Sequence, residues 1–176
     1  LIEGKGLGGK ETESLAILSR AVKINAGIWA EDLHITTGAN TVDAKTLEAS
    51  AIEGKGGRPA FALDTAAIGG MYAGRITLVG TEKGLGVNNS GTWSAEDNLT
   101  LDWNGDLKNS GTIYSKGNTD LRASRLENDK PIAAERNLSA AAKENIRNQG
   151  KLLAGENMGI YAGKTLDNAG HAMESG

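Results

Sequence analysis

Apolar and small residues alternate with polar residues along the second half of the chain, and asparagine or glycine interrupts this alternation at regular intervals. The stretch NSGTIYSKGNTDL, residues 109–121, shows the pattern, because apolar Ile113 and small Ser115 lie two positions apart between two asparagines. Alternation with period two places every second side chain on one face of a β-strand. Asparagine and glycine tolerate the backbone conformations of tight turns. The pattern therefore predicts short strands joined by tight turns.

The asparagines recur about every 20 residues. A first column, with spacings of 20, 19, 20 and 20 residues, consists of Asn89, Asn109, Asn128, Asn148 and Asn168. A second column, at position 10 of each complete unit, consists of Asn98, Asn118, Asn137 and Asn157. Position 3 is glycine in every unit except one, which has Lys130. Positions 5, 7, 11, 13 and 15 are mostly apolar or small, and position 5 of the last unit is Ala172.

Recurrence of similar side chains in fixed columns is what coils stacked about 4.8 Å apart require. Stacked asparagines can also form hydrogen-bonded amide ladders. A 20-residue coil with three short strands is a parallel β-helix, an all-β solenoid. A leucine-rich repeat needs an L-x-x-L-x-L core that the units lack, and a helical repeat is excluded because asparagine and glycine would interrupt every second turn. We expect about nine coils over roughly 40 Å.

The first half of the chain has a less regular version of the same pattern. Residues 28–35, IWAEDLHI, resemble residues 93–101, WSAEDNLTL, and Val22, Ile24, Ala26 and Ile28 alternate on one face. The apolar spacing in residues 14–21 permits a helix, but its continuation into alternation favours a strand. Residues 53–61, EGKGGRPAF, combine glycine, proline and charge, and predict a loop.

Composition narrows the classes of function. With 176 residues the chain can hold one domain with a core. A net charge of −3 argues against a sequence-independent nucleic-acid binder, and no apolar run is long enough for membrane insertion. The absence of cysteine means that the fold is stabilised without disulfides, and it suits a chain that crosses an oxidising compartment unfolded. Neither end looks natural and no signal peptide is evident, so we expect a piece of a longer protein.

The sequence resembles a known family. Residues 19–44 and 61–91 are similar to the end of the secretion domain of filamentous-haemagglutinin-type exoproteins, and the units after Asn89 resemble the haemagglutinin repeats that follow it. The blocks GGMYAGRI and GTEKGLGV are the most specific, and their family-motif residues are Gly69, Gly70, Met71, Tyr72, Gly80, Thr81, Glu82 and Gly84. We therefore expect residues 1–88 to end the secretion domain and residues 89–176 to begin the repeats.

This resemblance implies a large right-handed β-helix that Gram-negative bacteria export through the periplasm by two-partner secretion. The implied partner is a dedicated outer-membrane transporter, and distal regions would meet a receptor on a host or neighbouring cell. The family includes adhesins, haemolysins and the stalk proteins of contact-dependent growth inhibition, which carry a toxin. Its N-P-N-L and N-P-N-G-I secretion motifs do not occur here, so no residue for transporter recognition can be assigned.

The residues themselves predict no catalytic, metal or cofactor site. The stretch GKGLGGKE, residues 4–11, nearly matches a P-loop but has Glu11 where Ser or Thr binds Mg²⁺. The two histidines, His34 and His171, belong to distant coils. A β-helix carbohydrate-active enzyme needs acids that converge on one face, but six aspartates fall at six different phases of the repeat: Asp97, Asp102, Asp106, Asp120, Asp129 and Asp167.

The sequence thus favours a non-enzymatic structural stalk segment of a secreted cell-surface protein, an adhesin or a toxin-delivery protein. The second interpretation is a lateral face that binds a host glycan or protein, which a column of solvent-facing aromatics would favour. Tyr114 and Tyr161, at positions 6 and 14, do not form such a column. Trp93 and Trp103 are expected in the core, whereas Trp29 follows inward Ile28 and points outward or fills a corner.

Overall fold

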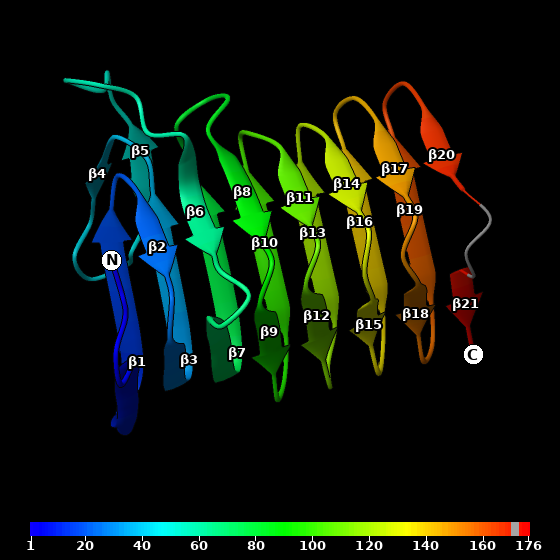
Figure 1. Ribbon diagram of the computed structural model, residues 1–176, viewed down its shortest axis with the longest axis horizontal. Coiled ribbons are helices and arrows are strands. Elements are labelled where there is room, and N and C mark those ends of the chain that lie inside the picture. Colours follow the sequence, from blue (N-terminus) through cyan, green and yellow to red (C-terminus); the bar gives the residue numbers. More distant parts are fainter. Residues whose placement is uncertain (170–172) are drawn as a thin grey trace.

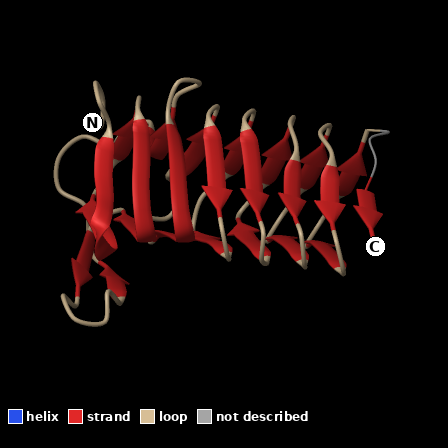
Figure 2. Cartoon of the chain, turned by 90° about the horizontal axis from the view of Figure 1, so that it is seen from below, coloured by secondary structure: helices blue, strands red, loops and turns tan. Residues whose placement is uncertain are grey.

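The computed structural model describes residues 1–169 and 173–176, and for residues 9–12 it describes only the backbone. The described part of the chain contains strands and turns but no helix (Figures 1 and 2). Successive coils stack along one axis, from the N-terminal coils in blue to the C-terminal coils in red (Figure 1). The predicted all-β fold, a parallel solenoid with coils of about 20 residues, is confirmed.

Two parallel sheets run the length of the solenoid. The narrow sheet holds, in spatial order, β2 (Val22–Ile24), β6 (Phe61–Thr65), β8 (Gly86–Asn89), β11 (Leu107–Asn109), β14 (Leu126–Asn128), β17 (Ile146–Asn148) and β20 (Leu166–Asn168). The broad sheet begins with three long strands, β1 (Leu7–Ser19), β3 (Gly27–Thr37) and β7 (Gly70–Gly80). The long strands are visible at the N-terminal end in Figure 2.

Beyond β7 the broad sheet divides into two faces. The first broad face consists of β9 (Thr92–Ala95), β12 (Thr112–Ser115), β15 (Ile132–Ala134), β18 (Leu152–Ala154) and β21 (Met173–Ser175). The second broad face consists of β10 (Leu99–Trp103), β13 (Thr119–Ala123), β16 (Leu138–Ala142) and β19 (Met158–Ala162). Each coil that follows β7 therefore adds strands to three faces, as the 20-residue unit predicts.

The division begins at a bend inside the long strands. The segment 70–73 of β7 pairs with β9, and the segment 76–80 pairs with β10. Met71 and Ala73 are buried before the bend, and Ile76 and Leu78 are buried after it, so the inward side changes from odd to even positions. In the next coil the bend is replaced by a turn at residues 96–97. This register accounts for the resemblance between residues 28–35 and 93–101, since Ile28 and Trp93 both pair with Met71.

The core lies between the faces and is filled by the alternating residues that the sequence predicts. Trp93 and Trp103 are 0% and 2% exposed, which confirms their assignment to the core. The Trp93 indole nitrogen donates to the Thr65 hydroxyl at 3.1 Å, and the Trp103 indole nitrogen donates to the Leu85 carbonyl at 2.8 Å. Each large ring therefore has a partner for its only polar atom.

The solenoid has about eight turns, not nine, because one coil carries an insertion. Ile24 and Thr65 are partners on adjacent narrow-sheet strands although they lie 41 positions apart in the chain. The extra residues leave the solenoid and form an antiparallel hairpin of β4 (Asn40–Val42) and β5 (Ala49–Ala51), followed by the predicted loop up to Phe61 in β6. The hairpin was not expected from the sequence, whereas the strand predicted over residues 14–21 is confirmed as far as Ser19, where β1 ends.

The last coil departs from the predicted register. Leu152 pairs with Met173, one position beyond the Ala172 that the 20-residue count places there. The connection between β20 and β21 therefore contains one more residue than the corresponding turns before it. Gly170, His171 and Ala172 lie outside the described residues.

Candidate functional site

The first asparagine column forms a continuous amide ladder inside the solenoid. Each side-chain Nδ2 donates to the Oδ1 of the asparagine in the next coil, over 2.8, 2.7, 2.7 and 2.8 Å from Asn89 to Asn168. The first four members are 0% exposed, and Asn168 is exposed at the C-terminal end. Buried amides are tolerated here because each one has a neighbour that satisfies it.

The second asparagine column lies at a corner and is only partly buried. The Oδ1 atoms of Asn98, Asn118 and Asn137 each accept a hydrogen bond from the backbone N–H of the asparagine in the next coil, at 2.8, 3.2 and 3.3 Å. Asn137 and Asn157 also donate from Nδ2 to the preceding asparagine, at 2.8 and 2.9 Å. The side-chain donors thus point toward the N-terminal coil, opposite to the direction in the buried column.

The first family-motif block lies at the start of β7, where the backbone approaches neighbouring coils closely. A Cβ on Gly69 would collide with the Ile24 carbonyl oxygen, and the Tyr72 ring covers Gly70. Met71 is fully buried, whereas Tyr72 points outward and is 39% exposed. These four residues therefore combine close packing of coils with an exposed aromatic ring.

The second block lies at the end of β7 and in the turn that follows it. Gly80 leaves room for the Trp103 ring, which a Cβ at that position would meet. Thr81 contacts the Asn40 side chain at the base of the hairpin. Gly84 has a φ of +76°, a left-handed conformation that favours glycine. The block thus connects the core to the insertion.

Glu82 holds the insertion to the solenoid through Arg20. The Arg20 Nε and Nη2 atoms donate to the Glu82 carboxylate at 3.0 and 2.9 Å, and Arg20 Nη1 donates to the carbonyl oxygens of Lys55 and Gly57 at 2.7 and 3.2 Å. The backbone N–H of Ala39 adds a hydrogen bond of 3.1 Å to Glu82. The Arg20 hydrogen bonds, with the Ala39 N–H, hold the pKa of Glu82 below its usual range. We call this arrangement the Arg20–Glu82 clasp.

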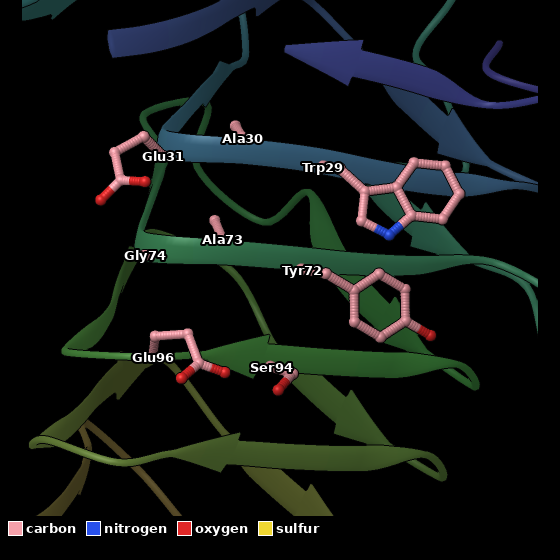
Figure 3. A pocket seen from close by; sticks show the side chains of 8 residues that line it. All are labelled: Trp29, Ala30, Glu31, Tyr72, Ala73, Gly74, Ser94 and Glu96. Atoms are coloured by element: carbon pink, nitrogen blue, oxygen red, sulfur yellow. The ribbon is translucent and has the colours of Figure 1, made fainter. Parts of the chain in front are cut away.

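A shallow pocket of about 500 Å³ lies on the outer surface where β3, β7 and β9 are neighbours (Figure 3). Trp29 and Tyr72 lie side by side along one edge of it, and Glu31 and Glu96 lie at the other. Trp29 thus takes the outward of its two predicted orientations. Sequence reasoning missed the pair because Trp29 and Tyr72 lie 43 positions apart; the shared Gly-x-aromatic spacing of Gly27–Trp29 and Gly70–Tyr72 was the available signal.

Side chains of opposite charge from neighbouring coils pair at the corners. Arg125 pairs with Asp106 at 2.5 Å, and in the adjacent corner column Lys164 pairs with Glu144 at 3.3 Å. Lys116 likewise pairs with Glu96. Among the described residues there is no group of three or more potential metal ligands, and the glycine-rich residues 4–9 lead into strand β1 rather than into a helix. Among the residues that the structure describes, no helix has the length and apolar character needed to cross a membrane.

Comparison with known proteins agrees with these features. The TPS secretion domain family model matches residues 1–113, and the haemagglutinin repeat model matches residues 128–173. The chain is 40% identical over 142 residues, 68% of its length, to "Toxin CdiA" of Yersinia pestis. It is 34% identical over 176 residues, 99% of its length, to "tRNA nuclease CdiA" of Yersinia mollaretii. No solved structure matches it significantly.

The chain spans only 4% and 6% of these two relatives. The chain matches the secretion-domain and repeat part of these relatives. The nuclease activity in the name of one relative therefore belongs to that protein. The stacked coils, the asparagine columns and the matched family models lead to one assignment. The chain belongs to the TPS secretion domain family, the two-partner secretion exoproteins of the filamentous-haemagglutinin type.

Proposed function

We propose that the chain is a non-enzymatic structural segment of a large exoprotein at the Gram-negative cell surface, an adhesin or a toxin-delivery protein. It would join the end of the secretion domain, residues 1–88, to the first stalk coils, residues 89–176. The observation that carries the proposal is the buried asparagine ladder, which continues in one direction through five coils. The change from long strands to three faces after β7 supports the proposed boundary.

The ladder suits a fibre because each coil presents the next with a matching row of donors and acceptors. A coil that has folded outside the cell provides a template on which the following coil can fold, so growth of the solenoid would draw the chain outward. The partner in export would be the outer-membrane transporter of the two-partner system, and distal regions would carry a receptor-binding or toxic activity.

Export of the full-length parent protein tests this function. Asn128→Ala removes a buried ladder member, whereas Asn104→Ala removes the same side chain from an exposed turn and serves as the matched control. We expect Asn128→Ala to slow the appearance of protease-protected protein at the cell surface and Asn104→Ala to leave it unchanged. Equal surface appearance of both variants and the parent would contradict the proposed role.

A direct binding face is the second candidate function. The sequence predicted no column of exposed aromatics, but Trp29 and Tyr72 are neighbours on β3 and β7 and both point outward. This pair favours a lateral binding site.

A further inference from the structure

The outward column that runs along β3, β7, β9 and β12 contains three aromatic residues. Trp29 pairs with Tyr72, Tyr72 pairs with Ser94, and Ser94 pairs with Tyr114, so these side chains follow one another along the solenoid axis. Tyr114 donates a hydrogen bond to Glu135 in the next coil. The column therefore consists of three aromatic rings, with the Ser94 hydroxyl between the second ring and the third.

The first two rings form a flat platform. Their centroids are 6.0 Å apart and their planes differ by 16°. Each ring folds back over a glycine two positions earlier in its own strand, Trp29 over Gly27 and Tyr72 over Gly70. In Figure 3 the rings lie side by side above adjacent strands, with nearly parallel planes. This arrangement leaves broad aromatic surface on the outside of the molecule.

Hydrogen-bonding groups lie at a fixed distance from the platform. Glu31 in β3 and Glu96, just after the end of β9, each follow the ring column by two positions, and Gly74 between them has no side chain and leaves room for Glu31. Ser94 contributes a hydroxyl beside Tyr72. Glu96 also pairs with Lys116. The pocket thus joins an apolar surface to two carboxylates, which accept hydrogen bonds and donate none.

We propose that this pocket binds a pyranose unit of an oligosaccharide. The C–H face of the sugar would lie on the Trp29 and Tyr72 rings, and its hydroxyls would donate to Glu31 and Glu96. A ligand with one flat apolar face and many donors matches both halves of the lining, as small-molecule sites require. A compact organic cation matches less well, because such a cation is bound best when aromatic faces enclose it, and these rings form a flat surface.

The inference deepens the second candidate function and is independent of the fibre role. The rings also shield the backbone at Gly27 and Gly70, a stabilising role known for aromatics beside strand glycines. Shielding alone would make ring removal destabilising without creating any affinity for sugar, so direct binding measurements separate the two roles.

Isothermal titration calorimetry of the 176-residue chain with cellotetraose and chitotetraose tests the proposal. We expect binding of at least one tetrasaccharide, with Trp29→Ala and Tyr72→Ala each weakening it by about tenfold or more, since ring stacking contributes on the order of one decade of affinity. Glu31→Gln is expected to weaken binding through loss of a charged acceptor. Tyr161→Ala, which removes an exposed tyrosine from a different face, is the matched control and should bind as the parent does.

Tyr72→Phe keeps the ring and should retain binding. If Tyr72→Ala fails to fold, Glu31→Gln becomes the informative variant, because it keeps both rings and removes one charged acceptor, and binding equal to that of Tyr161→Ala would then overturn the proposal. The proposal is overturned if neither tetrasaccharide binds, or if Tyr72→Ala binds as well as Tyr161→Ala. Binding of tetramethylammonium without binding of either sugar would also overturn it, in favour of a cation site. None of these results depends on export of the parent protein, so they leave the fibre role to its own test.

Discussion

The Asn109 side chain lies in the core, where its Oδ1 accepts a hydrogen bond from Asn89 and its Nδ2 donates one to Asn128. Asn109→Ala would leave the buried Oδ1 of Asn128 without its donor, and the Nδ2 of Asn89 with only a 3.5 Å hydrogen bond to the Thr112 carbonyl. Because each such group costs roughly 1–3 kcal/mol, we expect a loss of about 3 kcal/mol in the free energy of unfolding. Urea unfolding followed by circular dichroism measures this loss.

Asn168→Ala removes the exposed C-terminal member of the same ladder and is the matched control. Water can replace the bond that its Oδ1 accepts, so we expect a loss well below that of Asn109→Ala. Equal losses for the two variants would show that burial of the ladder adds nothing to stability.

Gly80 shows how one missing side chain determines where a larger one packs. Gly80→Ala would bring a methyl group into the Trp103 ring, which is 2% exposed. Overpacking of this kind costs about 1–3 kcal/mol. The near-ultraviolet circular dichroism of the tryptophans should change as well, because the ring must shift.

Gly159→Ala is the control for this substitution, since a Cβ on Gly159 meets no atom within 4 Å and the residue lies in strand β19. We expect this variant to be neutral or slightly more stable than the parent. If Gly80→Ala were equally well tolerated, the close fit of Trp103 against β7 would not be a constraint on the fold.

At the scale of elements, the hairpin of β4 and β5 depends on the Arg20–Glu82 clasp rather than on the solenoid core. The pKa of Glu82 is lowered by Arg20 in the folded protein, so the unfolded state binds a proton more readily than the folded state. The clasp therefore contributes its full stability above the ordinary carboxyl range and loses it as the pH falls through the lowered pKa. We expect residues 38–58 to lose hydrogen-exchange protection, after correction for intrinsic rates, in acid before the repeats do.

Glu82→Gln removes the titrating group while keeping its size. We expect this variant to show faster exchange in residues 38–58 already at neutral pH, and no further loss of their protection over the acid range in which the parent loses it. A hairpin that exchanges identically in the parent and the variant at every pH would mean that other contacts, such as Arg58 with the Lys83 carbonyl, hold the insertion.

The regular coils could be predicted from sequence because the same constraint acts in every turn. A side chain at position 5 or 7 must pack against the side chain at the same position of the next coil. A few columns of asparagine, glycine and small residues therefore specify the strands, the corners and the register of the coils. The hairpin of β4 and β5 occurs once in the chain, so no repeated position predicts it. Its anchor joins Arg20 to Glu82, 62 positions apart, and neither residue belongs to a column.

The pocket was missed for a related reason. In the repeats, residues that stack lie 20 positions apart and are compared directly, but the insertion separates Trp29 from Tyr72 by 43 positions. The bend within β3 and β7 was hidden too, because burial changes from even to odd positions within β3 and from odd to even positions within β7, and alternation alone predicts a constant phase. The family-motif residues are well placed in the fold, and their functional importance stays a prediction.

Across the whole molecule, each coil contacts mainly the coils before and after it, so stability is distributed along one dimension. The exposed ion pairs at the corners also join neighbouring coils. A pair such as Arg125 with Asp106 contributes only roughly 0–1 kcal/mol to stability, but it places opposite rather than like charges in successive coils.

This arrangement predicts that damage to one coil spreads only to its neighbours. Leu121 is fully buried and pairs with Leu101 and Ala140 in the adjacent coils. Leu121→Ala would leave a cavity that costs about 2–5 kcal/mol locally. Hydrogen exchange should show the greatest loss of protection in β10, β13 and β16, with a smaller loss in β7 and β19, the next strands on either side. Arg122→Ala, at the next position but exposed, should leave all five strands unchanged. A uniform loss of protection from β7 to β19 would instead mean that the coils unfold as a single cooperative unit, and a fibre built from them would then fold in larger blocks than one coil at a time.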